Sequence, residues 1–110
     1  MHELAMTEHI VAICLSHAAG RPVRRVTLEI GRLTSVVPDS LRFYFDLCTK
    51  NTPLEGAVLE IIEISGRGRC ETCGAERTLE SLYEQCDCGS CALQYLAGQE
   101  LKVKELELRA

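Results

Sequence analysis

The spacing of apolar residues predicts two helices in the first half of the chain. From Glu3 to Ala19, apolar residues recur every three or four positions, which is typical of one face of an amphipathic helix. The residues of this face are Leu4, Ile10, Val11, Cys14, Leu15 and Ala18. A second helix is expected to begin at Pro38, because a proline ring suits the first helical turn. Its apolar stripe consists of Leu41, Tyr44, Phe45 and Cys48.

Three further segments have the pattern of strands. Val23–Leu33 alternates apolar and polar residues, Ala57–Ile64 is rich in β-branched residues, and Glu100–Leu108 alternates again. Helices and strands therefore follow one another, and the last strand comes after a cysteine-rich segment. This order predicts an α+β fold: a three-stranded sheet with two helices on one face, plus a small zinc ribbon-like lobe inserted before the last strand.

The last predicted strand changes phase within its length. Its apolar residues are Leu101, Val103, Leu106 and Leu108, and the first two have the opposite parity to the last two. A β-bulge inserts one extra residue and so moves the following side chains to the other face. A bulge near Lys104 or Glu105 would therefore place all four apolar residues on the core side.

Composition also predicts how the chain divides into domains. Ser65–Arg69 is rich in glycine and basic, so it is expected to form a hinge. The segment that follows has few large apolar residues for its length, and metal binding would have to supply much of its folding free energy. We expect an α/β domain from residues 1–66 and 97–110, and a zinc-binding domain from residues 67–96.

Five of the seven cysteines lie within one window of 22 residues. They are Cys70, Cys73, Cys86, Cys88 and Cys91. Two short-spaced clusters separated by twelve residues are typical of a tetrahedral thiolate site, usually for zinc. Cys70 and Cys73, in the pattern C-x-x-C-G, are the expected first pair. Arg67, Arg69 and Arg77 flank this pair and would offset the net charge of about −2 of a zinc tetrathiolate.

The second cluster offers three sulfurs for the two remaining positions. Cys88 precedes Gly89 and so resembles the second sulfur of the first cluster. Its partner is either Cys86, through a tight C-x-C, or Cys91, through a C-x-x-C. Spacing alone favours Cys91, because C-x-x-C gives a loop of ordinary length. A catalytic zinc is not expected, since it would keep an open coordination position and need acid–base residues nearby.

Charge and hydropathy exclude several other classes of protein. A net charge of −4 argues against nucleic-acid binding, which normally requires a basic surface. No apolar run is long enough for a membrane span, and the first residues do not resemble a secretory signal. The protein is therefore expected in the cytoplasm. In that reducing compartment, clustered cysteines are expected to bind metal rather than form disulfides.

The first three residues, Met1-His2-Glu3, form a second group of candidate metal ligands. A histidine at position 2 places an imidazole beside the α-amine and an ionisable backbone amide, and Glu3 adds a carboxylate. Such nitrogen-rich donor sets suit Ni(II) or Cu(II). Cys14 and Cys48 lie on apolar stripes and are expected to be buried side chains rather than ligands.

Several separated motifs together resemble one family. They are Met1-His2-Glu3, Leu28-Glu29-Ile30-Gly31, Leu41-Arg42-Phe43, Gly56-Ala57, the two cysteine clusters, and Leu106-Glu107-Leu108. In order and spacing the chain resembles the HypA/HybF family of hydrogenase maturation factors over nearly its whole length. The resemblance implies a nickel metallochaperone for [NiFe] hydrogenase assembly, which is not an enzyme. It also implies Ni(II) as cargo, bound by His2 with Glu3 adjacent, and structural Zn(II).

The resemblance also bears on the fourth zinc ligand. In this family the second cysteine pair is normally C-P-x-C-G, and Cys88-Gly89 matches its second half. The first cysteine of that pair would then fall at Gln85, so the nearest sulfur is that of Cys86 and one residue is missing. Family register thus favours Cys86 over Cys91.

The resemblance finally implies partners. They are the GTPase HypB and the large subunit of the hydrogenase, and the chain itself is expected to be a monomer or weak homodimer. No nucleotide-binding P-loop is present in the sequence, so any GTP would be bound by the partner. The alternative function is a zinc ribbon adaptor that docks other macromolecules without nickel. A second alternative is a thiol oxidoreductase.

Overall fold

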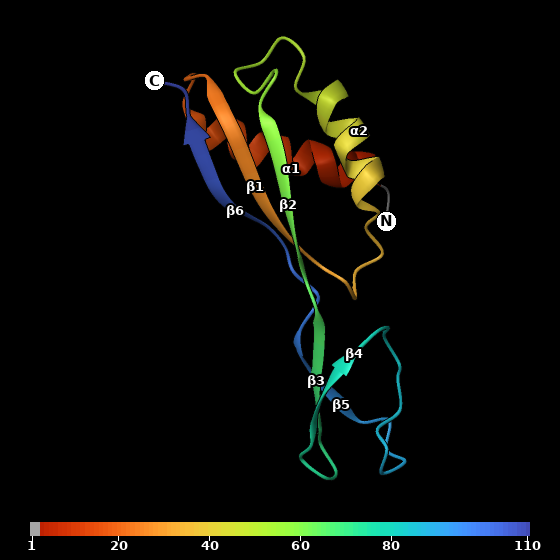
Figure 1. The fold of residues 1–110 in the computed structure, drawn as a ribbon. Coiled ribbons are helices and arrows are strands. Elements are labelled where there is room, and N and C mark those ends of the chain that lie inside the picture. Colours follow the sequence, from red (N-terminus) through yellow and green to blue (C-terminus); the bar gives the residue numbers. More distant parts are fainter. Residues whose placement is uncertain (1–2) are drawn as a thin grey trace. The chain divides into compact units, whose positions relative to one another are not determined.

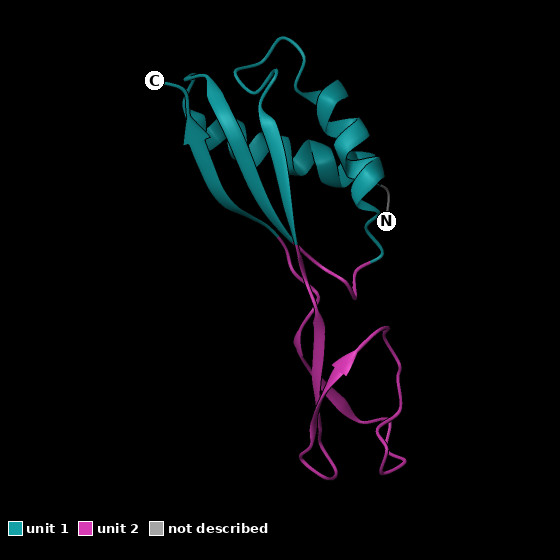
Figure 2. Ribbon diagram, in the orientation of Figure 1, with its two compact units in different colours: residues 1–29, 35–62, 102–110 teal, residues 30–34, 63–101 magenta. Residues whose placement is uncertain are grey.

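The computed structural model describes residues 3–110. Its elements, in chain order, are α1 (Glu3–Ala18), β1 (Val23–Gly31), α2 (Pro38–Cys48), β2 (Val58–Ile64), β3 (Gly66–Cys70), β4 (Glu76–Leu79), β5 (Leu93–Ala97) and β6 (Leu101–Leu108) (Figure 1). The chain forms two compact units (Figure 2). Unit 1 contains the described residues up to Glu29 with Ser35–Ile62 and Lys102–Ala110, and unit 2 contains Ile30–Thr34 and Glu63–Leu101.

Unit 1 is built on a three-stranded sheet with the order β2-β1-β6. The start of β1 lies beside the approach to β2, since the Val23 N–H donates to the Pro53 carbonyl. The end of β6 lies beside the start of β1, since the Arg109 N–H donates to the Pro22 carbonyl. The strands β1 and β2 therefore run in parallel, with α2 as the crossover, and β6 runs antiparallel to β1 (Figure 1). Both helices cover the same face of the sheet (Figure 1).

The predicted fold class is confirmed by this arrangement. The core of unit 1 forms where α1 and α2 pack on alternate residues of β1. Its main side chains are Ile10, Val11, Cys14, Ala18, Val26, Leu28, Leu41 and Phe45. The predicted apolar face of α1 is wrong at its start: Leu4 is 43% exposed, and Met6 and Thr7 are buried instead. The Thr7 hydroxyl is satisfied there, because it donates to the Glu3 carbonyl at 2.6 Å.

The predicted change of phase in β6 is also confirmed. Leu101, Val103, Leu106 and Leu108 are all half-buried. Lys104 and Glu105, between the two apolar pairs, are both exposed. All four apolar side chains of this strand are therefore partly shielded from solvent despite their different parity in the sequence, as is Glu107.

Unit 2 contains a second small sheet with the order β4-β3-β5, in which β3 is antiparallel to both neighbours. The prediction of a hinge at Ser65–Arg69 was wrong, because Gly66 to Cys70 form the central strand of this sheet. Gly66 and Gly68 are both buried. The glycines therefore serve close packing in a strand rather than flexibility.

The close packing of β3 is visible in what a side chain would meet there. A Cβ atom at Gly66 would lie 2.5 Å from the Leu79 carbonyl oxygen and 2.8 Å from the Leu33 side chain. A Cβ atom at Gly68 would lie 2.8 Å from a Leu79 methyl group. Leu79 and Leu33 are both buried and provide the apolar contacts of unit 2 directly against the glycine backbone.

Substitution of Gly68 tests this packing. Gly68→Ala would force its methyl group into Leu79, so we expect the free energy of unfolding of unit 2 to fall by about 1–3 kcal/mol. Hydrogen exchange of the β3 and β4 backbone amides would measure the loss in unit 2 separately from unit 1. Ser81→Ala, at an exposed position outside the strands, is the matched control. Equal protection in the two variants would contradict the packing argument.

Candidate metal centre

Four cysteine sulfurs of unit 2 lie close together. Their Sγ atoms, from Cys70, Cys73, Cys86 and Cys88, are all within 4.8 Å of one another. The Cys70 and Cys88 sulfurs are 3.6 Å apart, and the Cys73 and Cys86 sulfurs are 3.7 Å apart. A zinc ion bound by four thiolates at about 2.3 Å requires neighbouring sulfurs about 3.8 Å apart in a tetrahedron. The donor set and its spacing therefore fit a tetrahedral zinc ion.

Two turns with similar hydrogen bonds present these sulfurs. In the first turn the Cys70 N–H donates to the Ala75 carbonyl at 2.9 Å, and the Gly74 N–H donates to the Cys70 carbonyl at 2.8 Å. In the second turn the Cys86 N–H donates to the Ser90 carbonyl at 2.9 Å, and the Gly89 N–H donates to the Cys86 carbonyl at 2.8 Å. The second turn thus repeats the first with one residue fewer.

The glycines after Cys73 and Cys88 explain why these turns can close. Gly74 has φ 77° and Gly89 has φ 94°, in the left-handed region that side chains disfavour. Each glycine therefore reverses the chain directly behind a sulfur of the group. Cys91 has no glycine behind it, is exposed, and lies outside the four-sulfur group.

Hydrogen bonds and neighbouring sulfurs shift the thiol pKa values in opposite directions. The Cys73 N–H donates to the Cys70 sulfur at 3.4 Å, and this bond lowers the pKa of Cys70 to about 6. A backbone bond from Ser90 lowers the pKa of Cys88, but the nearby Cys70 and Cys86 sulfurs outweigh it and raise that pKa to about 12. The pKa of Cys73 is also raised, because its backbone bond from Ala75 is outweighed by adjacent sulfurs. A Cys70 thiolate beside the protonated Cys73 and Cys88 thiols is an arrangement in which a metal cation can replace protons.

Two of the three flanking arginines are engaged by one carboxylate. Arg67 and Arg69 on β3 pair with the two oxygens of Glu76 on β4, at 2.8 and 2.9 Å. These bonds lower the pKa of Glu76, chiefly through the bond from Arg69. Because the groups are about half exposed, the pairs contribute little to stability. The positive charges of Arg67 and Arg69 are therefore partly neutralised by Glu76 and are less able to offset the charge of the sulfurs.

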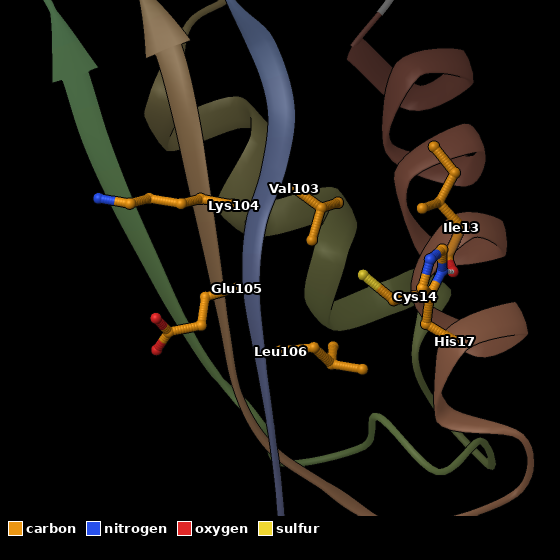
Figure 3. Close-up of a pocket in the computed structure, with 7 residues that line it drawn as sticks. All are labelled: Ile13, Cys14, His17, Val103, Lys104, Glu105 and Leu106. Atoms are coloured by element: carbon orange, nitrogen blue, oxygen red, sulfur yellow. Dashed lines mark hydrogen bonds between the residues drawn. The ribbon is translucent and has the colours of Figure 1, made fainter.

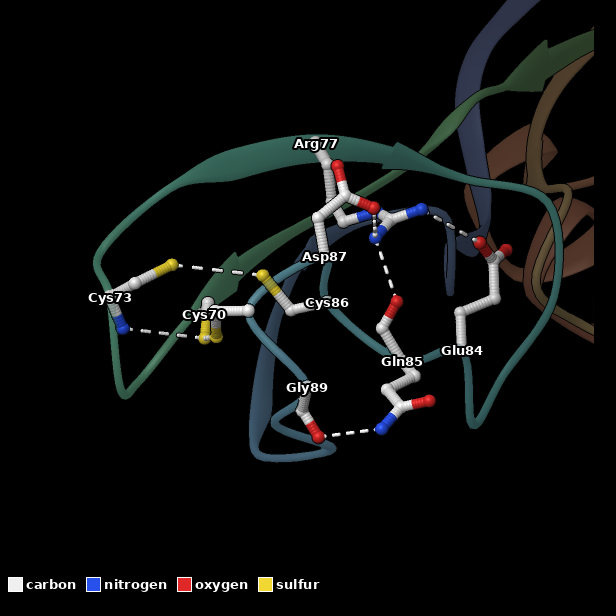
Figure 4. A network of polar contacts seen from close by, with 9 residues as sticks. Cys70, Cys73, Arg77, Glu84, Gln85, Cys86, Asp87 and Gly89 are labelled. Carbon is white, nitrogen blue, oxygen red and sulfur yellow. Dashed lines mark hydrogen bonds and ion pairs between the residues drawn. The ribbon is translucent and has the colours of Figure 1, made fainter.

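The third arginine, Arg77 on β4, holds the second cysteine turn (Figure 4). Its guanidinium donates to the Gln85 carbonyl at 2.7 Å and lies 3.6 Å from carboxylate oxygens of Glu84 and Asp87. The Gln85 side chain in turn donates to the Gly89 carbonyl at 2.6 Å. Arg77 therefore orients the turn that carries Cys86 and Cys88. The sequence predicted a role for Arg77 in charge balance but not its role in orienting the second cysteine turn, because Arg77 meets Gln85 only in the folded chain.

The other candidate ligands lie elsewhere or outside the described residues. His2 is among the residues that the structure does not describe, and Glu3 is the half-buried first residue of α1. Cys14 is buried and Cys48 half-buried, and neither belongs to the four-sulfur group. Burial raises the pKa of Cys14 to about 11, so this thiol stays protonated at neutral pH.

Comparison with known proteins decides the family. A family model described as hydrogenase/urease nickel incorporation, metallochaperone, HypA matches residues 1–108. The chain belongs to the HypA family. The resemblance inferred from the sequence motifs is thereby confirmed, and the chain is a maturation factor of the metallochaperone class rather than an enzyme.

HypA proteins of several bacteria match along nearly their whole length. The chain is 53% identical over 108 residues to the hydrogenase maturation factor HypA of Nostoc punctiforme, which covers 98% of this chain and 96% of that protein. It is 55% identical over 109 residues to HypA of Rippkaea orientalis, with the same coverage. HypA of Geobacter metallireducens is 47% identical over 109 residues, covering 98% of this chain and 99% of that protein.

A solved structure shows the same fold. The solution structure of the nickel metallochaperone HypA from Helicobacter pylori superposes with a TM-score of 0.73 at 23% sequence identity, covering 100% of this chain and 99% of that one. At this identity the likeness bears on the fold alone. Among the described residues 3–110, no helix is both long and apolar enough to cross a membrane.

The thiol pKa values predict proton release when the four sulfurs bind a divalent cation. At pH 7 the Cys73 and Cys88 thiols are protonated, because both pKa values lie above the ordinary thiol value, while the Cys70 thiol is largely ionised. Binding should therefore release at least two protons, and the apparent affinity should rise about a hundredfold or more per pH unit near neutrality. A pH indicator and a chromophoric chelator would measure these quantities. Release of fewer than two protons per zinc would contradict the scheme, and Cys88→Ser should lower the number.

Proposed function

We propose that this chain is a nickel metallochaperone that binds Ni(II) at its N-terminus and delivers it for [NiFe] hydrogenase maturation. The observation that carries the proposal is the HypA family match, which spans residues 1–108 and so includes the N-terminal Met1-His2-Glu3. The His2 imidazole, the α-amine and backbone amides would form a square-planar site, with Glu3 adjacent. Deprotonated amides carry negative charge, which the N-terminus of α1, beginning at Glu3, would stabilise.

A second metal would act as scaffold in this scheme. We assign a structural zinc ion to Cys70, Cys73, Cys86 and Cys88, and leave Cys91 outside the coordination sphere. The sulfur spacing of 3.6 and 3.7 Å supports four thiolate ligands at once. Four protein ligands leave no open position for a substrate, so a structural role follows from the donor set.

The delivery step requires partners that this chain does not contain. We propose the GTPase HypB and the large subunit of the hydrogenase, with the whole process in the cytoplasm. The chain has no P-loop sequence, so nucleotide binding would belong to the GTPase. A site made from an amine, amides and an imidazole needs deprotonated ligands, and mild acid would therefore favour nickel release.

Separate replacement of Cys86 and Cys91 tests the zinc assignment. Cys86→Ser should lower the zinc affinity of the protein by at least about a hundredfold, because a ligand and its charge are lost. Cys91→Ser is the matched control and should retain zinc as the unchanged protein does. Elemental analysis after dialysis against a chelator would measure both. Zinc loss in Cys91→Ser with retention in Cys86→Ser would reverse the assignment.

Ni(II) titration of the untagged protein tests the N-terminal site. His2→Ala should remove tight nickel binding, while the zinc content stays at one ion per chain. One extra residue before Met1 should have the same effect, because it converts the α-amine into an ordinary peptide. His9→Ala, at an exposed position on α1, is the control. Unchanged nickel affinity in both N-terminal variants would refute the proposal.

A further inference from the structure

Strand β6 forms an open edge of the sheet in unit 1. The sheet has the order β2-β1-β6, so β1 is the single strand neighbour of β6 among the described residues. An edge strand presents backbone N–H and carbonyl groups that can pair with another strand. Which strand fits this edge depends on the side chains that β6 would place opposite it.

The sequence of β6 is complementary to itself when reversed. Its eight residues read Leu-Lys-Val-Lys-Glu-Leu-Glu-Leu from Leu101 to Leu108. Two such strands placed antiparallel, with the midpoint between Lys104 and Glu105 as the centre, would oppose apolar with apolar and lysine with glutamate throughout. The pairs would be Leu101 with Leu108, Lys102 with Glu107, Val103 with Leu106, and Lys104 with Glu105, each with one residue from either copy.

The side-chain directions in β6 agree with this alignment. Directly opposed residues of antiparallel strands project to the same face of a sheet. Val103 and Leu106 both point toward α1, and Lys104 and Glu105 both point away from it (Figure 3). The change of phase in β6 therefore makes its two halves match across the midpoint. In a regular strand, Lys104 and the Glu105 of a second copy would project to opposite faces.

The surroundings of β6 also leave apolar surface for a second copy to cover. A cavity of about 230 Å³ lies between α1 and β6, lined on its apolar side by Ile13, Val103 and Leu106 (Figure 3). These three side chains are half-buried in the isolated chain. A strand added beside β6 would bring a second valine and leucine against Leu106 and Val103 and remove more of this surface from water.

The charges of β6 are free to pair at the centre of the strand. Lys102 pairs with the half-buried Glu29, and Glu107 pairs with the exposed Arg24, both at 3.3 Å. Each pair has at least one solvent-exposed partner, so these bonds are weak and can be shared. Lys104 and Glu105 are exposed and have no ion pair within residues 3–110. The other edge strand, β2, carries glutamates but no lysine or arginine and lacks this complementarity.

We propose that β6 is a self-recognition surface that pairs antiparallel with β6 of a second copy of this chain. The two three-stranded sheets then form one continuous six-stranded sheet about a twofold axis. Both copies use the same residues, as required in a twofold symmetric dimer. The inference rests on β6, of which Lys102–Leu108 belong to unit 1 and Leu101 to unit 2, and it does not depend on nickel or zinc.

Charge reversal at the strand midpoint tests the interface. Sedimentation velocity of the full chain over a range of concentrations should show a dimer that weakens with added salt. Lys104→Glu or Glu105→Lys would place like charges opposite each other at both symmetry-related positions. Either change should raise the dissociation constant of the dimer by about tenfold or more. The double variant Lys104→Glu/Glu105→Lys restores opposite charges and should return that constant to within about threefold of the unchanged protein.

Hydrogen exchange gives a second readout on the unchanged protein. The β6 backbone amides should exchange more slowly as the protein concentration rises, while those of β2 should not change. A chain that stays monomeric at all concentrations would overturn the proposal. So would a dimer whose affinity is unaffected by the single reversals, or one that the double variant fails to restore. If a single variant loses its fold by circular dichroism, the exchange of β6 amides in the unchanged protein decides the question.

Discussion

Unit 2 depends on bringing four cysteine sulfurs from two turns within 4.8 Å of one another. Beyond this group, the buried large apolar side chains of unit 2 are Ile30, Leu33 and Leu79, of which the last two pack on the backbone of β3. The Cys73 N–H lowers the pKa of Cys70, whereas at Cys88 the neighbouring Cys70 and Cys86 sulfurs outweigh a backbone bond from Ser90 and raise the pKa. A cation that neutralises this group would turn the main electrostatic cost of unit 2 into its main stabilising interaction.

The same constraint explains the polar contacts around the sulfurs. Arg77 on β4 donates to the Gln85 carbonyl, and the Gln85 side chain donates to the Gly89 carbonyl, so these two bonds help to orient the second turn. Groups that orient metal ligands in this way are a regular part of metal sites. We propose two separate metal sites in this chain, one structural and one for the cargo. The four sulfurs would hold the first, and we assign the second to His2.

Sequence patterns were sufficient for unit 1 because its core is large and periodic. The stripe on α2 and the alternation of β1 predicted their elements closely, and the phase change in β6 was visible from Leu101 to Leu108. Patterns failed where a residue acts through a neighbour distant in sequence. Ser65–Arg69 was predicted to be a hinge because glycines suggest flexibility. In the structure, Gly66 and Gly68 lack side chains where Leu79 packs directly against the backbone. Strands β4 and β5 were missed because they have little apolar alternation.

The sequence by itself determined the fold class, the family and the cysteine window that supplies the metal ligands. Local periodicity and motif spacing carry that information, because they act along the chain. Tertiary structure decided which sulfurs meet: spacing alone favoured Cys91 and family register favoured Cys86, and the folded chain brings the Cys86 sulfur to 3.7 Å from that of Cys73. The reason is the left-handed turn at Gly89, which closes behind Cys88 and leaves Cys91 outside. Distance between sulfurs is a property of the folded chain, and no count of intervening residues replaces it.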